Sequence, residues 1–369
     1  MHVKLMIPGP IDLEETVLEE MGAPTVAHYG DEWLKVFHET TDLVKQVFAT
    51  SGRVYIMAGS GTLGLDAAVH STFSPGEKIA VGINGFFGIR MQEIVEANGL
   101  IAVPVEGPPE EPLDPAAFAR VLDDDPSIVG VALVHLETST AVLNPVDEIA
   151  QLARSRDKIT IVDAVSSLAG TPMQMDDWGI DLCVSGVQKG LGAAPGLGLV
   201  AVSPRAWDRI ENRSDPVRSW YLDLRRWQWY IDNWGHWHPS PITMPTALIK
   251  GLRVALQSLF AEGLEARLQR YEGLARRLRD GLAALDMALV VPEAQMTPVL
   301  TAAFCPPGVL SGDIVRYVEA EHHIKITAGF GDYKDRVIRI GHMGGAISED
   351  DIDSLLAALK QFFVERQVR

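Results

Sequence analysis

An aspartate and a lysine each follow an apolar run in the middle of the chain. Asp163 comes directly after Ile159–Val162, a β-branched run typical of a buried parallel strand. Lys189 follows a second apolar run, Ile180–Val184, and opens a glycine-rich loop. Because open α/β sheets bind ligands beyond the carboxyl ends of their strands, we expect the two side chains to share one site.

Pyridoxal phosphate chemistry requires this combination of an acid and a lysine. The pyridine nitrogen must stay protonated for the ring to accept electrons, and a carboxylate keeps it so. The aldehyde needs a lysine amine to hold it as a Schiff base. An arbitrary aspartate and lysine are more often a helix cap and a solvated loop residue, so this interpretation depends on further residues.

Four motifs that follow one another along the chain strengthen the interpretation of a pyridoxal phosphate site. They are DAVSSLAG (residues 163–170), WGID (178–181), SGVQKGLGAAPGLGL (185–199) and RIGHMG (339–344). Together they resemble the class V, fold-type I aminotransferases, specifically the alanine–glyoxylate and serine–pyruvate (serine–glyoxylate) group. The resemblance runs in order from Pro8-Gly9-Pro10 to Gly344. It implies an α/β fold: a large domain on a mixed, mostly parallel sheet, and a small C-terminal α+β domain.

Composition limits the partners and the compartment. The 369 residues are 47% apolar and 22% charged, which is ordinary for a soluble protein of two domains. The net charge of −17 argues against nucleic acid and anionic membranes as partners. No apolar run is long enough for a membrane span, and the N-terminal residues do not form a targeting peptide. The two cysteines predict neither disulfides nor a metal site, which suits the cytoplasm.

We expect three segments along the chain. Residues 1–18 form an N-terminal arm, residues 19–260 the large cofactor-binding domain and residues 261–369 the small domain. A long helical pattern from Thr246 to Leu285, with a break at Glu262-Gly263, should link the two domains. The resemblance further implies a homodimer with shared active sites, in which the arm runs along the other subunit.

A short strand, Val54–Met57, leads into Gly59-Ser60-Gly61-Thr62 and then an Ala/Leu-rich helix. Backbone N–H groups at a helix start, joined by two hydroxyls, can bind phosphate. Alone, such a run is as often a plain turn. Together with Asp163 and Lys189 it predicts that Ser60, Gly61 and Thr62 bind the 5′-phosphate.

The resemblance places five further cofactor contacts. Phe87 should stack on the ring, where many relatives carry tryptophan, and the Thr138 hydroxyl should contact the ring. Gln188 should hydrogen-bond the phosphate or a neighbouring group. Trp237 and Ser240 occupy the places of a tyrosine and a threonine that reach the phosphate of the neighbouring subunit, and serine retains the hydroxyl.

The predicted reaction is transamination. Lys189 would move the proton between the substrate Cα and the cofactor, while ionised Asp163 keeps the ring nitrogen protonated. Arg339, in the RIGHMG motif, would hold the substrate carboxylate, because its planar fork matches two oxygens. The resemblance implies alanine or serine as the donor, with glyoxylate preferred as acceptor and pyruvate as another. No second arginine is clearly placed for a distal carboxylate, but aspartate remains an open alternative.

Rival hypotheses within the same fold are a pyridoxal-phosphate lyase and a cysteine desulfurase. A desulfurase needs a reactive cysteine on a mobile loop. Cys183 lies inside a strand pattern and Cys305 at the end of another, so neither fits well.

Two other classes remain. A non-catalytic relative is disfavoured because Asp163, Lys189 and Arg339 are all present. A dinucleotide-binding protein would use GSGTLG (residues 59–64), which matches G-x-G-x-x-G, but no ribose-binding acid follows at the required distance.

Overall fold

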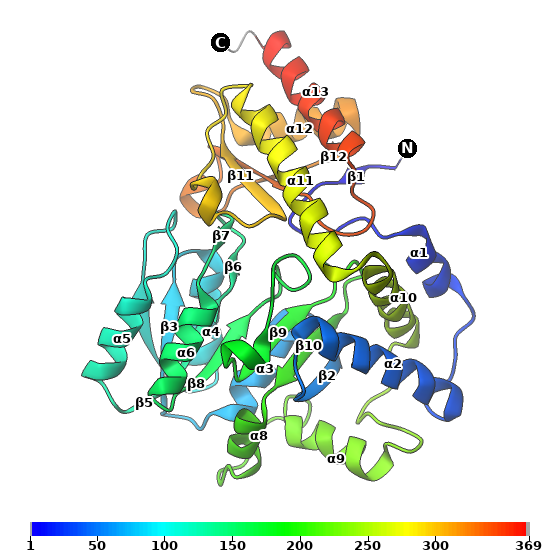
Figure 1. Cartoon of the computed structure of the whole chain (residues 1–369), viewed down its shortest axis with the longest axis vertical. Coiled ribbons are helices and arrows are strands. Elements are labelled where there is room, and N and C mark those ends of the chain that lie inside the picture. The colour runs from blue at the N-terminus through cyan, green and yellow to red at the C-terminus, as the bar shows by residue number, and fades with distance from the viewer. Residues whose placement is uncertain (1, 367–369) are drawn as a thin grey trace.

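The computed structural model describes residues 2–366 and has two parts, seen one above the other in Figure 1. The lower part contains a seven-stranded sheet surrounded by helices. The upper part contains a three-stranded sheet with helices α11, α12 and α13. No helix among residues 2–366 combines the length and apolarity needed to cross a membrane.

The seven-stranded sheet has the order β2-β10-β9-β8-β5-β3-β4. Strand β10 is antiparallel to both β2 and β9, and the other neighbours are parallel. The predicted mixed, mostly parallel sheet is therefore confirmed. Its strands are Arg53–Ala58 (β2), Lys78–Ile83 (β3), Ile101–Glu106 (β4), Ile128–Val134 (β5), Ile159–Asp163 (β8), Leu182–Gly186 (β9) and Leu197–Val202 (β10).

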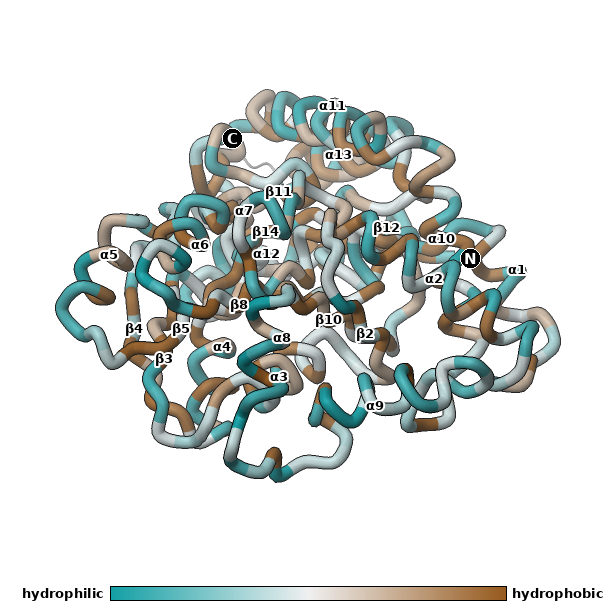
Figure 2. The backbone as a smooth tube through the Cα atoms, turned by 60° about the horizontal axis from the view of Figure 1, so that its bottom comes forward, coloured by the Kyte–Doolittle hydropathy of each residue, from teal (hydrophilic) through white to brown (hydrophobic). Residues whose placement is uncertain are grey.

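Helices pack on this sheet and bury its apolar strands. Strands β8 and β9 are buried along their whole length, as expected for β-branched runs covered on both faces. In Figure 2 apolar stretches gather along the central strands, while α11 alternates between polar and apolar turns. The helices of this part are Glu15–Gly22 (α1), Asp31–Phe48 (α2), Gly61–Thr72 (α3), Phe86–Ala97 (α4), Pro115–Asp124 (α5), Val146–Ser155 (α6), Met175–Trp178 (α7), Pro204–Glu211 (α8), Leu224–Trp234 (α9) and Thr246–Glu262 (α10).

A second hydrophobic core forms the upper part. Its sheet has the order β11-β14-β13, so β14 is the central strand. Two short 3₁₀ turns, Glu293–Gln295 and Gly331–Tyr333, lie in its loops. Its elements are Leu264–Ala283 (α11), Leu300–Phe304 (β11), Ser311–His322 (α12), Ile324–Lys325 (β12), Thr327–Ala328 (β13), Val337–Gly341 (β14) and Glu349–Glu365 (α13).

The long helical pattern breaks where the sequence predicts it. Helix α10 ends at Glu262 and α11 begins at Leu264. Gly263 between them has φ of 90°, a conformation that glycine adopts without steric cost. One hydrophobic cluster spans Val17 to Leu259, and another draws most of its members from Tyr271 to Phe363. We propose that these clusters are the cores of the large and small domains.

The N-terminal segment belongs with the upper part. Strand β1, Lys4–Leu5, pairs in parallel with β12, and the N–H of Gly341 donates to the carbonyl of Met6 at 3.0 Å. Met6 and Ile11 are buried in the second hydrophobic cluster. A short hairpin of β6, Leu136–Glu137, and β7, Val142–Leu143, follows β5 along the chain. The N-terminal segment thus brings residues 8–10 toward the centre of the molecule.

Candidate active site

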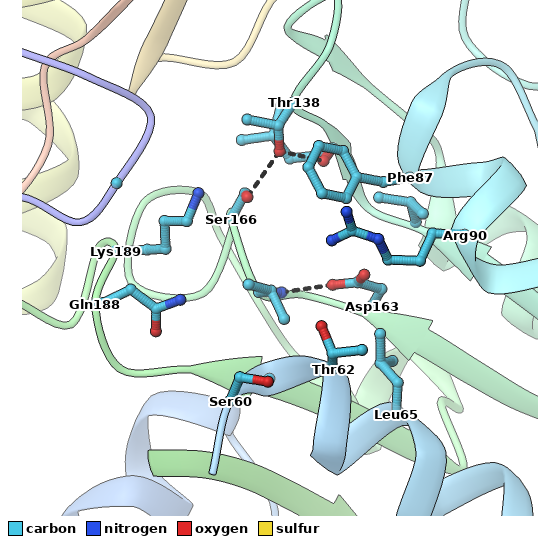
Figure 3. A pocket seen from close by; sticks show the side chains of 15 residues that line it. Ser60, Thr62, Leu65, Phe87, Arg90, Thr138, Asp163, Ser166, Gln188 and Lys189 are labelled. Carbon is cyan, nitrogen blue, oxygen red and sulfur yellow. Dashed lines mark hydrogen bonds between the residues drawn. The ribbon is translucent and has the colours of Figure 1, made fainter. Parts of the chain in front are cut away.

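Strand order brings the predicted acid and lysine together. Strands β8 and β9 are parallel neighbours, so Asp163 at the end of β8 and the loop after β9 lie at the same edge of the sheet. Figure 3 shows Lys189 and Gln188 on one side of a pocket, with Phe87 and Arg90 on the other. The lining residues are Gly9, Ser60, Gly61, Thr62, Leu65, Phe87, Arg90, Val134, Leu136, Thr138, Asp163, Val165, Ser166, Gln188 and Lys189.

The start of helix α3 forms one wall of the pocket. Ser60 is the residue before the helix, and Gly61 and Thr62 are its first two residues, so their N–H groups precede the hydrogen-bonded part of the helix. A side chain at Gly61 would collide with Val165, a neighbouring residue of the pocket lining. All three residues of the predicted phosphate site therefore line the pocket at a helix N-terminus, a place that favours anions.

Asp163 is buried in the lining of the pocket. One of its oxygens accepts a hydrogen bond from the N–H of Val165 at 2.8 Å, drawn as a dashed line in Figure 3. Burial raises the pKa of Asp163 to about 6, and that hydrogen bond opposes the rise. A protonated ring nitrogen next to this carboxylate would compensate for the lost solvation.

Lys189 lies beneath the N-terminal segment. Its Nζ donates to the carbonyl of Pro8, and its side chain is buried. Burial lowers the pKa of Lys189 to about 8, the positive charge of Arg339 lowers it further, and Asp163 opposes both. Gly9 has φ of 110°, and a Cβ there would stand 2.5 Å from Cδ of the lysine. Glycine thus lets the backbone pass directly over the amine.

Two more predicted contacts line the same pocket. The Thr138 hydroxyl donates to Ser166 Oγ at 2.7 Å, which fixes both side chains on the wall (Figure 3). The Oε1 atom of Gln188 is buried and has no hydrogen-bond partner within residues 2–366. An unpaired buried amide oxygen is costly, so a donor from a bound molecule would suit this position.

Helix α4 presents Phe87 to the pocket, and Glu137 holds the start of that helix. The Glu137 carboxylate accepts the N–H groups of Phe87 at 3.0 Å and Gly88 at 3.2 Å, and also that of Ser139 at 3.0 Å. Burial raises the pKa of Glu137, and these hydrogen bonds oppose the rise. Gly85 leaves room for the carboxylate, since a Cβ there would collide with it. The sequence analysis did not identify this cap.

Arg90 is a pocket residue that the sequence analysis missed. It follows Phe87 by three positions, so both lie on one face of α4. Its Cζ lies 4.9 Å from the centre of the Phe87 ring, and in Figure 3 the guanidinium reaches inward between Phe87 and Asp163. This helical spacing was the signal that could have identified Arg90.

Arg339 lies beside the pocket, on the central strand of the small sheet. Its Nε donates to the carbonyl of Ala328 and its Nη1 to that of Thr138, both at 3.0 Å. Its Cζ stands 4.1 Å from the centre of the Phe330 ring. Burial lowers the pKa of Arg339 to about 10, and Glu137 opposes the shift, so the group remains charged at neutral pH. The guanidinium is near the lysine but is not among the lining side chains.

The structure does not bring Trp237 and Ser240 into this pocket. The buried Ser240 hydroxyl donates to the carbonyl of Ile242 at 3.0 Å. Trp237 is 40% exposed and packs against Trp234 and Tyr29. Their predicted contact is with the site of a neighbouring subunit, so for both residues it stays a prediction.

The two cysteines are not placed as nucleophiles. Cys183 is buried in β9, where burial raises its pKa, and Cys305 is partly buried, with its pKa raised to about 12. Neither lines the pocket. Within residues 2–366 no group of three or more His, Cys, Asp and Glu side chains could hold a metal ion.

The pocket suits pyridoxal phosphate. It combines a helix N-terminus for the phosphate, a buried carboxylate for the ring nitrogen, an aromatic side chain and a lysine amine of lowered pKa. The family model of class V aminotransferases matches residues 13–333. The chain belongs to the class V aminotransferases, a pyridoxal-phosphate-dependent family.

Relatives span nearly the whole chain. The alanine–glyoxylate aminotransferase of Oryctolagus cuniculus is 32% identical over 369 residues, covering 98% of this chain and 92% of the relative. A protein of Synechococcus sp. described as the small subunit of a soluble hydrogenase is 34% identical over 365 residues, covering 98% and 93%. Because these two names describe different activities at similar identity, a relative's name alone does not define the reaction.

Solved structures agree on the fold. The ureidoglycine–glyoxylate aminotransferase of Bacillus subtilis superposes with a TM-score of 0.95 at 27% identity, covering 100% of this chain and 94% of that one. The apo cysteine desulfurase of Thermococcus onnurineus has a TM-score of 0.78 at 15% identity, covering 98% and 94%. At 15% identity the likeness to the desulfurase concerns the fold alone.

Proposed function

We propose that this chain transfers the amino group of a small L-amino acid, alanine or serine, to glyoxylate, with pyruvate as an alternative acceptor. The observation that carries the proposal is the convergence of Lys189, Asp163 and the start of helix α3 in one pocket, with Arg339 beside it. The named aminotransferases of rabbit and B. subtilis use different donors but share glyoxylate. Glyoxylate is therefore the preferred acceptor.

Five groups of this chain would hold pyridoxal phosphate. Ser60, Gly61 and Thr62 bind the phosphate at the helix start, Asp163 pairs with the ring nitrogen and Phe87 covers a ring face. When bound, the cofactor supplies an aldehyde that receives the amino group and a ring that accepts the electrons of the Cα–H bond.

Lys189 is the proton carrier in this proposal. With a pKa lowered to about 8, a substantial fraction of its amine is neutral near physiological pH. The neutral amine would take the proton from the substrate Cα and deliver it to the aldehyde carbon of the cofactor. Asp163, with a pKa of about 6, is ionised at that pH and stabilises the protonated ring nitrogen.

Arg339 binds the carboxylate shared by donors and acceptors. A guanidinium has five N–H donors, and two of them are used by the carbonyls of Ala328 and Thr138. The remaining donors can hold both oxygens of a carboxylate, and the two carbonyls fix the plane in which they point. A substrate with one carboxylate and a small side chain needs no second cationic side chain for its binding.

We infer that two copies form a dimer with shared sites. Four large aromatic side chains are at least one-third exposed near the end of α9: Tyr29, Trp229, Trp234 and Trp237. An exposed group of this kind is typical of an interface. Light scattering should give twice the mass of one chain, and a single-chain mass at micromolar concentration would contradict the inference.

We also infer a reducing compartment, the cytoplasm. Cys183 and Cys305 are both free thiols, one buried and one partly buried. Fractionation of the source cells tests this inference, and recovery outside the cytoplasm would contradict it.

The absorbance band of the bound cofactor, at roughly 400–430 nm, provides the test of function. L-alanine or L-serine should remove the band and glyoxylate should restore it, whereas L-aspartate should act weakly. Lys189→Ala should abolish turnover and still bind cofactor. Full activity of that variant would refute the mechanism, and release of sulfide from L-cysteine would favour a desulfurase.

A further inference from the structure

Four side chains next to the pocket form a layered stack. Phe86 and Phe330 are stacked, with ring centres 4.8 Å apart and planes inclined by 19°. The Cζ of Arg90 lies 5.1 Å from the centre of Phe86. The Cζ of Arg339 lies 4.1 Å from the centre of Phe330. Each ring of the stacked pair therefore has one guanidinium group close to it.

The stack joins the two parts of the molecule. Phe86 begins helix α4 of the lower part, while Phe330 lies in the loop after β13 of the upper part. Close by, the Tyr333 hydroxyl donates to Glu110 at 2.7 Å and makes a second link between the same parts. Phe86 is 40% and Phe330 36% exposed, so the stack is partly open to solvent.

Phe330 restricts Arg339 in the one direction that its hydrogen bonds leave free. The carbonyls of Ala328 and Thr138 hold the guanidinium through in-plane N–H groups. They do not prevent it from tilting out of that plane. The face of an aromatic ring attracts the cation and blocks the tilt on one side.

We propose that Phe330 is a positioning residue that orients Arg339 for bidentate binding of the substrate carboxylate. This inference rests on the proposed function, since it assigns the carboxylate to Arg339. Its consequence is selective: without the ring face, carboxylate-bearing ligands bind less well, whereas the cofactor and ligands without a carboxylate are unaffected.

The experiment uses the holoenzyme and two ligands of the same size. Propanoate is an unreactive carboxylate whose affinity is measured by calorimetry, and L-alaninamide is an amine donor without a carboxylate, followed through the cofactor band. Phe330→Leu should weaken propanoate about 5- to 30-fold, the size of a partly desolvated cation–π contact. The rate of band loss with L-alaninamide should stay within about twofold.

Two matched variants separate positioning from general damage. Phe330→Tyr keeps the ring face and should bind propanoate like the wild type. Tyr333→Phe removes the neighbouring link to Glu110 without touching Arg339, and should also leave propanoate binding unchanged. Melting curves of all three variants identify any loss of folding.

The experiment distinguishes a failure of the inference on Phe330 from a failure of the proposed function. The inference is overturned if Phe330→Leu binds propanoate like the wild type, if L-alaninamide loses rate by the same factor, or if the wild type binds no propanoate. If the wild type binds propanoate but no amino acid changes its cofactor band, the proposed function fails while the comparison of Phe330 variants still decides the role of the ring.

Discussion

Burial penalises the charged forms of both Lys189 and Asp163, and the charge of Arg339 adds to the effect on the lysine. Arg339→Gln should therefore raise the pKa of Lys189. Because only the neutral amine reacts with an aldehyde, the midpoint for cofactor incorporation, near pH 8 in the wild type, should move upward, and incorporation at pH 7.5 should slow. Stopped-flow absorbance across pH 6–10 measures this rate.

Arg90→Gln provides the control for that experiment. Arg90 also lines the pocket, but its charge is not among the causes of the lysine shift. Its pH midpoint should match the wild type. An unmoved midpoint in Arg339→Gln would contradict the electrostatic link between the two groups.

Asp163 should lower the stability of the cofactor-free protein. Its folded pKa of about 6 lies above the usual value of 3.8, so stability is lost as pH rises from about 3.8 to about 6. Asp163→Asn removes the buried charge and keeps an acceptor for the N–H of Val165. Apoprotein melting at pH 8 should show a gain of about 1–3 kcal/mol, falling to roughly half at pH 5.

The same variant should bind cofactor less tightly, because the carboxylate that we propose as the partner of the ring nitrogen is lost. A variant that is less stable than the wild type at pH 8 without cofactor would show that the carboxylate is not penalised there. The carboxylate would then aid cofactor binding without lowering the stability of the apoprotein.

The sequence alone identified only some of the residues that line or support the pocket. Asp163, Lys189 and Ser60–Thr62 were found because each follows a strand pattern, and strand ends converge in this type of sheet. Glu137 was missed because its role depends on a contact with α4, some 50 positions away in the chain. Such a contact leaves no local signal.

At the scale of elements, the start of helix α4 depends on one carboxylate. One oxygen of the Glu137 carboxylate accepts the N–H groups of Phe87 and Gly88, and the other accepts that of Ser139. Because the amide of Glu137→Gln keeps only one oxygen, one of these two sets loses its acceptor. The expected loss is about 1–3 kcal/mol in the free energy of unfolding, with weaker cofactor binding because Phe87 is less well held. Chemical denaturation of the apoprotein and cofactor titration measure the two effects.

Glu93→Gln is the matched control, since Glu93 is an exposed residue of the same helix. It should change stability by no more than about 0.5 kcal/mol. Equal effects of the two substitutions would contradict the special role of Glu137.

Most strands and helices could be predicted from periodicity, and two features could not. The direction of β10 was hidden, because a buried strand shows the same apolar run whether it is parallel or antiparallel. The second feature is the change of partner within residues 324–328, where β12 pairs with β1 and β13 pairs with β14. Partner exchange of this kind depends on tertiary structure.

At the scale of the whole molecule, the N-terminal segment is part of the second core. Met6 is fully buried there, and its backbone bonds to Lys325 and Gly341. Met6→Ala should lower the free energy of unfolding by about 2–5 kcal/mol through the cavity it leaves. Guanidinium denaturation followed by circular dichroism measures the change.

Leu18→Ala gives the comparison, because Leu18 is 53% exposed on the nearby helix α1. Its expected effect is below about 0.5 kcal/mol. If Met6→Ala were equally mild, the segment would contribute little to the core.

The position of β2 at the edge of the seven-stranded sheet has a consequence for biosynthesis. Its partner in that sheet is β10, which begins at Leu197, so a growing chain carries β2 unpaired until more than half of the protein has been made. Helix α3, whose start lines the pocket, follows β2 directly. Nascent chains that stop before residue 197 would therefore leave an open strand edge, a known route to aggregation, and could not capture the cofactor during translation.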